Sequence, residues 1–166
     1  MNFVRTLIVC VFCTALGSLQ TLAQDVPTPV GPVVLIITGA GDAEPIKFDR
    51  ASLKGIDDTV IATSTPWTDG VLQFQGVSLH LITDLLGVED GTLLATALND
   101  YSVEIPVSDA VAGGPIIAYA RDGVEMSVRD KGPLWIIYPF DSDPRYQTAV
   151  VLSRSIWQLD RIDVLD

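Results

Sequence analysis

Three groups of side chains in this sequence are of types that recognise a flat, hydrogen-bonding ring. The first is Trp67, in the segment IATSTPWTDG at residues 61–70, where Pro66 interrupts a β-branched run. An indole face stacks on a planar ring and contributes about 0.5–1.5 kcal/mol beyond the area it buries. Because no predicted strand surrounds Trp67, it either fills the core from a loop or presents its face to a ligand.

The other two groups supply polar atoms. Asn99, Asp100 and Tyr101 follow one predicted strand, and Arg129 and Lys131 precede another. A carboxylate can accept two N–H bonds from an aminopyrimidinone edge, and a cation can meet a carbonyl, hydroxyl or phosphate. Asn-Asp is also a common turn pair that binds its own backbone, and exposed cations also suit a solvated rim. Both interpretations stay open for these residues.

Short elements must position these groups, and strands outnumber helices. A short helix is expected at 49–54, with Asp49 as its N-cap and Gly55 at its end, and a second at 79–86, capped by Ser78 and stopped by Gly87. One helical turn is expected at 108–112. The predicted strands are 33–38, 58–65, 72–75, 93–97, 101–106, 115–120, 125–128, 134–139 and 156–165. This pattern predicts an α+β fold, a compact β-rich mixed domain with short helices, whose strands bring the polar loops to one edge.

The N-terminal residues predict export. Residues 1–23 combine one basic residue, a short apolar run and a small-x-small ending, which is typical of a cleaved signal peptide. Residues 24–32 contain three prolines and predict an extended leader. The remainder, 33–166, has the length of a single domain. We therefore expect a periplasmic protein that is not inserted in the membrane after cleavage.

The residue types present limit the metal and catalytic sites that the mature chain can form. Both cysteines, Cys10 and Cys13, lie in the predicted signal peptide, and His80 is the one histidine of the chain. The mature chain therefore offers no thiolate ligand or cysteine nucleophile. Removing Arg5 from the 10 basic residues leaves 9 against 21 acidic ones, a net charge of −12. This charge argues against nucleic acid or anionic lipid as a partner. A Gly39-Ala-Gly41 sequence is too little to predict a nucleotide site.

Four segments in order resemble a known family. They are FQGVSLHLITDLLG from residue 74, ALNDYSVEIPVSD from residue 97, IAYARDGVEMSVRDKGPLWIIYP from residue 117 and SIWQLDRIDV from residue 155. This succession resembles the oxidoreductase molybdopterin-binding domain, which has the sulfite-oxidase-like fold, over residues 45 to 165. The resemblance implies a β-rich α+β fold that binds a pterin.

The chain departs from that family at its metal ligands. The family's enzymes hold molybdenum through a cysteine in the loop that matches TSTPWTDG, and no cysteine is present there. Lys131 stands where these enzymes tend to carry a histidine. A soft thiolate is the ligand that such a metal site needs, so no molybdenum is expected.

A metal-free subgroup, the periplasmic pterin-binding proteins of the PruR type, is similar in size and in its signal peptide. That resemblance implies a non-catalytic protein that carries a reduced pterin to the periplasmic domain of a membrane-bound signalling protein, of the kind that makes or degrades cyclic di-GMP. It assigns Trp67, Asn99, Asp100 and Tyr101 to the pterin pocket, and charge and position add Arg129 and Lys131. The alternatives are a molybdopterin-dependent oxidoreductase with cysteine-free ligation and an interaction domain whose pocket has decayed.

Overall fold

Two β-sheets form the body of the protein. The computed structural model describes residues 28–39 and 44–165; the predicted signal peptide and the first residues of the predicted leader lie outside this range. The first sheet has the order β2-β1-β10-β5-β6. Its strands are β1 (Leu35–Thr38), β2 (Ile46–Phe48), β5 (Thr92–Ala97), β6 (Ser102–Pro106) and β10 (Leu159–Leu165). Strands β1 and β10 are parallel, and the other neighbours are antiparallel.

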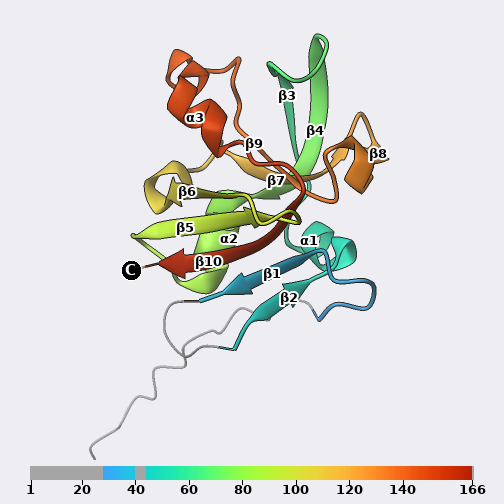
Figure 1. Ribbon diagram of the computed structural model, residues 1–166, viewed down its shortest axis with the longest axis vertical. Helices are drawn as coiled ribbons and strands as arrows, with labels where there is room; N and C mark the ends of the chain where they lie inside the picture. The colour runs from blue at the N-terminus through green and yellow to red at the C-terminus, as the bar shows by residue number, and fades with distance from the viewer. Residues whose placement is uncertain (1–27, 40–43, 166) are drawn as a thin grey trace, which may run out of the picture.

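The second sheet is antiparallel and has the order β3-β4-β7-β8, with β9 also paired to β7. Its strands are β3 (Thr59–Ser64), β4 (Val71–Ser78), β7 (Ile116–Arg121), β8 (Val124–Glu125) and β9 (Trp135–Ile137). The β3–β4 hairpin projects away from the body on the same side as α3 (Ala149–Arg154) (Figure 1). The loop that carries Trp67 joins these two strands, so the hairpin positions that residue.

Residues 131–137 and 155–159 form a seam that joins the two sheets. Trp135 of β9 makes an isolated antiparallel bridge with Trp157, which precedes β10. Ile136 N donates to the Ile156 carbonyl at 2.9 Å, and Leu159 N donates to the Leu134 carbonyl at 3.0 Å. These two segments together are the seam.

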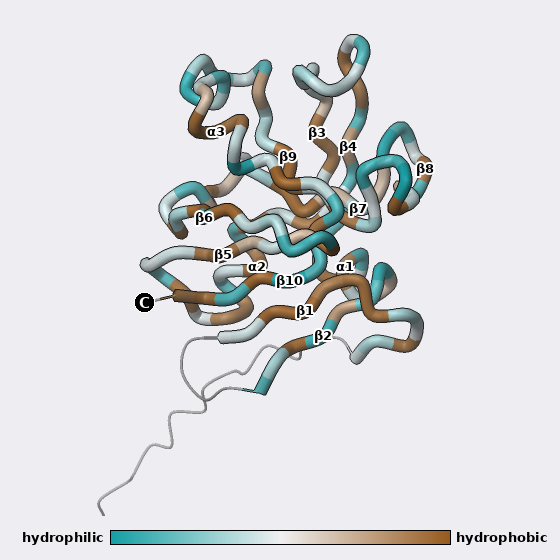
Figure 2. The backbone as a smooth tube through the Cα atoms, viewed as in Figure 1, coloured by the Kyte–Doolittle hydropathy of each residue, from teal (hydrophilic) through white to brown (hydrophobic). Residues whose placement is uncertain are grey.

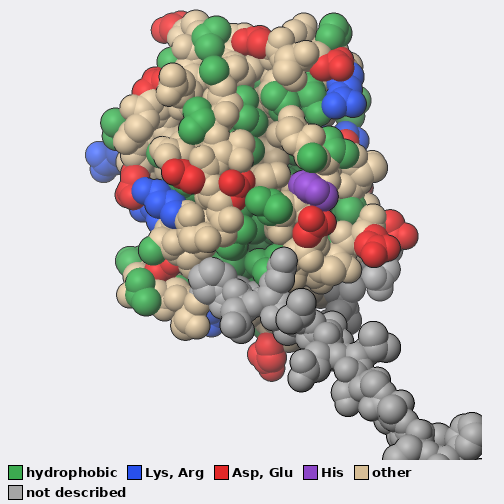
Figure 3. All heavy atoms as spheres, turned by 180° about the vertical axis from the view of Figure 1, so that it is seen from behind, with side chains coloured by type: hydrophobic (Ala, Val, Ile, Leu, Met, Phe, Trp, Pro, Cys, Tyr) green, Lys and Arg blue, Asp and Glu red, His purple; other side chains and the backbone are tan. Residues whose placement is uncertain are grey.

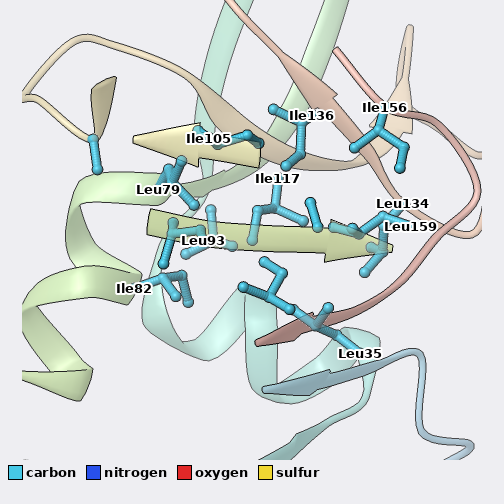
Figure 4. Close-up of a cluster of buried hydrophobic side chains, with 14 of the residues drawn as sticks. Leu35, Leu79, Ile82, Leu93, Ile105, Ile117, Leu134, Ile136, Ile156 and Leu159 are labelled. Atoms are coloured by element: carbon cyan, nitrogen blue, oxygen red, sulfur yellow. The ribbon is translucent and has the colours of Figure 1, made fainter. Parts of the chain in front are cut away.

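The main core lies between the sheets and the helices α1 (Arg50–Ile56) and α2 (Leu79–Leu86). Apolar side chains from β1, α2, β7 and the seam converge in it (Figure 4). The hydropathy pattern follows this arrangement, since apolar segments run through the strands and polar ones gather at the loops (Figure 2). A smaller cluster includes Phe74 and Trp135, and most of its buried side chains come from strands of the second sheet. In the described part of the chain, no helix has the length and apolar character needed to cross a membrane.

The structure confirms the predicted α+β class and most of the predicted elements. Asp49 caps α1, where its side chain accepts from Ser52 N, although the helix continues through Gly55 to Ile56. Gly87 ends α2 in the left-handed conformation. The prediction for Ser78 is wrong in its detail: the residue stands at the N-cap but its side chain makes no capping hydrogen bond.

Other differences concern short elements. Strand β2 and helix α3 were not predicted, and the predicted strand at 125–128 is reduced to β8, followed by a short 3₁₀ helix at Val128–Asp130. Another 3₁₀ helix, Val107–Asp109, begins one residue before the expected turn at 108–112, and a third covers Pro144–Gln147. These elements have few residues, and pairing or packing with distant segments decides them more than local pattern does.

The described end of the predicted leader is attached to the domain. Val30 N and Gly31 N donate to Asp49 Oδ2 at 2.7 and 2.6 Å. The same carboxylate receives Ser52 N on its other oxygen at 2.7 Å. These bonds, with the bond from Ser52 N the largest influence, hold the pKa of Asp49 well below its ordinary range. One carboxylate thus ties the leader to the start of α1.

Acid should weaken this tie. Since the folded-state pKa of Asp49 is depressed, its contribution is complete above the unfolded value of about 3.9 and is lost as pH falls below it. We expect Asp49→Asn to lower the unfolding free energy at neutral pH and to make its decline between about pH 4 and pH 2 shallower than in the unmodified protein. Urea unfolding at several pH values measures both effects. Asp90→Asn, at an exposed site, should leave the decline unchanged.

Gly76 tests the contact between β4 and β7. A Cβ on Gly76 would lie 2.3 Å from the Ile117 carbonyl oxygen, so the two strands must separate to accommodate it. We expect Gly76→Ala to cost about 1–3 kcal/mol of unfolding free energy, as overpacking typically does. Gln73→Ala, on an exposed position of the same strand, should change it by less than about 0.5 kcal/mol. Equal effects of the two changes in chemical denaturation would contradict this account of the strand pair.

Candidate binding site

A pocket of about 280 Å³ lies beside the seam. It is bounded by the loop after β3, the turn between β5 and β6, and helix α3 with the seam residues that follow it. These segments are distant in sequence, and the meeting of the two sheets brings them together. The lining residues are Trp67, Ala97, Asn99, Tyr101, Leu152, Ser153, Ser155, Ile156 and Trp157.

Trp67 both packs on the core and faces the pocket. Its ring lies 6.0 Å from that of Trp135 and 6.4 Å from that of Phe140, between centroids. It also meets Trp157 in a T-shaped arrangement at 5.6 Å. All three tryptophans of the chain therefore lie in one cluster. Trp67 packs against both hydrophobic clusters, as the core interpretation expects, and it also lines the pocket. Its contact with a ligand stays a prediction.

The pocket wall carries an amide and several hydroxyl groups. Asn99 Oδ1 accepts a hydrogen bond from Tyr101 N at 3.3 Å, so this oxygen stabilises the turn as the backbone interpretation of Asn99 expected. The Ser153 hydroxyl donates to the Val150 carbonyl at 2.7 Å, which leaves its lone pairs able to accept. Tyr101 is largely exposed, with 56% of its surface accessible, and lies at the edge of the pocket.

Asp100 lies in the same turn but does not line the pocket. Its carboxylate pairs with Arg161 of β10, with Oδ1 and Nη2 2.6 Å apart. This hydrogen bond raises the pKa of Arg161. Asp100 also has a positive φ of 64°, a conformation that asparagine and aspartate adopt more readily than most residues. In this structure, Asp100 fixes the shape of the turn on which its neighbour Asn99 is placed.

The two predicted cations also lie outside the pocket lining. Lys131 Nζ is 4.8 Å from the ring centroid of Trp157 and 5.6 Å from that of Trp135, so its charge rests against the indole cluster. Arg129 is exposed in the 3₁₀ helix before it. Of the six residues predicted to bind a ligand, the structure brings Trp67, Asn99 and Tyr101 to one pocket. It places Lys131 against the ring of Trp157, which lines that pocket.

Sequence reasoning missed the contribution of residues 152–157. Trp157 lies in the predicted strand at 156–165, yet 37% of its surface is accessible and it lines the pocket, whereas Trp135, in the predicted strand at 134–139, is fully buried. These residues were missed because helix α3 was not predicted. The side chain of its N-cap, Thr148, accepts a hydrogen bond from Val151 N at 3.3 Å. A threonine ahead of an apolar run was the one available indication of this helix.

Metal-ligating side chains do not gather in the described residues. No group of three or more His, Cys, Asp or Glu side chains is arranged there to hold a metal ion. His80 lies on α2, where its Nε2 is 3.5 Å from Asp84 Oδ2, and Figure 3 shows this histidine at the surface beside acidic side chains. It does not line the pocket beside Trp67.

Comparison with known proteins shows the class of fold. No protein-family model matches the chain, and no curated protein matches it. The chain has a mixed α+β fold, sheet-rich with few short helices, of the sulfite-oxidase-like kind. One solved structure that carries this likeness is the sulfane dehydrogenase SoxCD from Paracoccus pantotrophus, with a TM-score of 0.58 and 16% sequence identity. The match covers 80% of this chain and 38% of that chain. At this identity the likeness concerns the fold alone.

Trp67 should be a stabilising residue as well as part of the pocket wall. A fully buried tryptophan typically costs about 3–5 kcal/mol when replaced by alanine, and Trp67 is only half-buried. We therefore expect Trp67→Ala to lower the unfolding free energy by about 2 kcal/mol, and Trp67→Phe by clearly less because an aromatic ring remains. Chemical denaturation measures both values. If Trp67→Ala unfolds like the unmodified protein, Trp67 does not join the two clusters.

Proposed function

We propose that this is a non-catalytic periplasmic protein that binds a reduced pterin and regulates a membrane-bound signalling partner. The observation that carries the proposal is the pocket beside the seam, where two indole rings, an amide and several hydroxyl groups border a space of about 280 Å³. This volume lies just below the usual range for small-molecule sites, which is about 300–1,000 Å³. It suits a single bicyclic ring.

The aromatic groups provide the surface for a flat ligand. Trp67 and Trp157 both line the pocket, and their rings are inclined at 68° to one another. Because the planes are inclined, one indole can stack on the ring while the other meets its edge, and both arrangements are favourable for aromatic pairs. Lys131 lies over the Trp157 ring and Trp135 packs against it, so this wall is held in position before a ligand arrives.

The polar groups suit the aminopyrimidinone edge of a pterin. Such an edge has N–H donors beside a carbonyl acceptor. Asn99 can donate from Nδ2 to the carbonyl, since its Oδ1 is occupied by Tyr101 N, and the Ser153 hydroxyl can accept from a ring N–H. In this proposal Asp100 acts through its ion pair with Arg161, which holds the turn, rather than by direct contact.

Molybdenum chemistry does not fit the residues present. The sulfite-oxidase-like fold implies a cofactor whose metal is held by a soft thiolate, and the described residues contain no cysteine. The loop that would carry this ligand holds Thr65 and Thr68, whose hydroxyls are bonded to each other at 2.8 Å, next to Trp67. We therefore derive no redox step from this site.

The signalling part of the proposal rests on the resemblance to the PruR type. A binding protein can transmit a signal only if its loaded and empty forms differ in their affinity for the partner. Tyr101 and Trp157 are both exposed and both line the pocket, so a ligand there would change the surface that a partner meets. By linkage, the partner must strengthen or weaken pterin binding by the same factor.

Direct binding tests this function. Protein purified from the periplasm should release a fluorescent pterin on unfolding, or should bind an added dihydropterin with one site per chain. We expect Asn99→Ser to weaken binding at least about tenfold, or about 1.4 kcal/mol, because the serine hydroxyl can retain the turn but the amide donor is lost. Fluorescence titration measures the affinity.

The matched control for this titration is Gln73→Ala, which removes an exposed amide on β4 far from the pocket lining. It should bind like the unmodified protein. Absence of bound pterin together with absence of binding to pterin, dihydropterin and tetrahydropterin would remove the proposed function.

A further inference from the structure

A second pocket lies next to the first, and Leu152 lines both of them. This second pocket has a volume of about 380 Å³ and includes Pro66 and Leu152 in its lining. Leu152 also lines the pocket beside the seam, and Trp67, the neighbour of Pro66, does the same. The partition between the two spaces is therefore Leu152 on one side and the loop that carries Trp67 on the other.

The second pocket has a different chemistry. Its polar lining residues are Ser64, Thr65, Asp141 and Gln147, and no basic side chain is among its described lining residues. Asp141 is fixed there, since its carboxylate accepts from Ser64 N at 2.6 Å and from Ser64 Oγ at 2.7 Å. These bonds hold the pKa of Asp141 below its ordinary value, so it is a carboxylate at neutral pH. This lining suits uncharged hydroxyl groups.

Leu152 is held in its position by the helix that carries it. Leu152 N donates to the Thr148 carbonyl at 2.9 Å, and its carbonyl accepts from Ser155 N at 3.1 Å. Two residues further on, Arg154 Nη1 is 2.8 Å from Asp109 Oδ2, and both of these side chains are largely shielded from solvent. The half-buried Leu152 side chain packs against the main core. The Leu152 side chain is therefore a rigid part of the lining of both pockets.

We propose that Leu152 determines ligand size in this protein. It closes the pocket beside the seam behind a bare or shortly substituted pterin ring, and it keeps longer hydroxylated substituents out of the second pocket. Shortening Leu152 joins the two spaces, so that the ring remains against the indoles while its substituent reaches the hydroxyl, amide and carboxylate groups of the second pocket. This inference rests on the proposed pterin binding and adds the residue that sets its selectivity.

The test compares two ligands in matched variants. Unsubstituted pterin and biopterin, which carries a dihydroxypropyl chain, each in its oxidised, dihydro and tetrahydro form, are titrated by fluorescence into the unmodified protein and into Leu152→Ala. We expect the unmodified protein to prefer pterin. Leu152→Ala should shift the ratio of the two dissociation constants at least about tenfold toward biopterin. Leu152→Met, of similar volume, should keep the original ratio.

Two further variants complete the design. Val150→Ala, on an exposed position of the same helix that lines neither pocket, should keep the original ratio and so control for an effect on the helix. Leu152→Val removes less volume, is less prone to unfold, and should shift the ratio in the same direction by a smaller factor.

The possible outcomes separate the two proposals. If no variant binds either ligand, the proposed function fails, and the role of Leu152 fails with it. If pterin binds but the ratio is the same in the unmodified protein, Leu152→Val and Leu152→Ala, the role of Leu152 is overturned and pterin binding stands. A ratio that shifts equally in Val150→Ala also overturns it, since the effect then belongs to the helix and not to the partition.

Discussion

The pairing of residues 131–137 with residues 155–159 is the interaction on which the rest of the structure depends. It connects β9 of one sheet to the start of β10 in the other through the Trp135–Trp157 bridge and flanking backbone hydrogen bonds. Trp135 Nε1 adds a bond to the Ser155 carbonyl at 3.1 Å inside the core. The seam thus adds backbone pairing to the connecting segments and side-chain contacts that hold the two sheets together, and it places the segments around the pocket.

The pocket is a consequence of the seam. Trp157 is placed at the surface because its neighbours Ile156 and Leu159 are drawn into the core on either side. Trp67 reaches Trp157 from the β3–β4 hairpin. The turn with Asn99 is connected to the seam because Leu98 N donates to the Gln158 carbonyl at 2.9 Å. The same aromatic residues thus stabilise the junction of the two sheets and form a wall that suits a planar ligand.

The sequence predicted the fold better than the site. Periodic segments such as residues 79–86, with a glycine stop, form the expected elements because local pattern and burial agree there. Helix α3 was missed because its valines have low helix propensity and its position depends on the Arg154–Asp109 pair, which joins residues 45 apart. Asp100 was assigned to a ligand from its carboxylate and from the family resemblance, since no local pattern indicates that Arg161 lies beside it.

The central claim is that a pterin ring binds against the indoles of Trp67 and Trp157, stacked on one and meeting the other with its edge. A proton–nitrogen correlation spectrum resolves the three indole N–H signals of the chain, and titration with pterin tests the claim at single residues. We predict that the signals of Trp67 and Trp157 shift as the ligand saturates. The signal of Trp135, which is buried and bonded to the Ser155 carbonyl, should move least. Three indole signals that stay in place at saturating pterin would contradict the account.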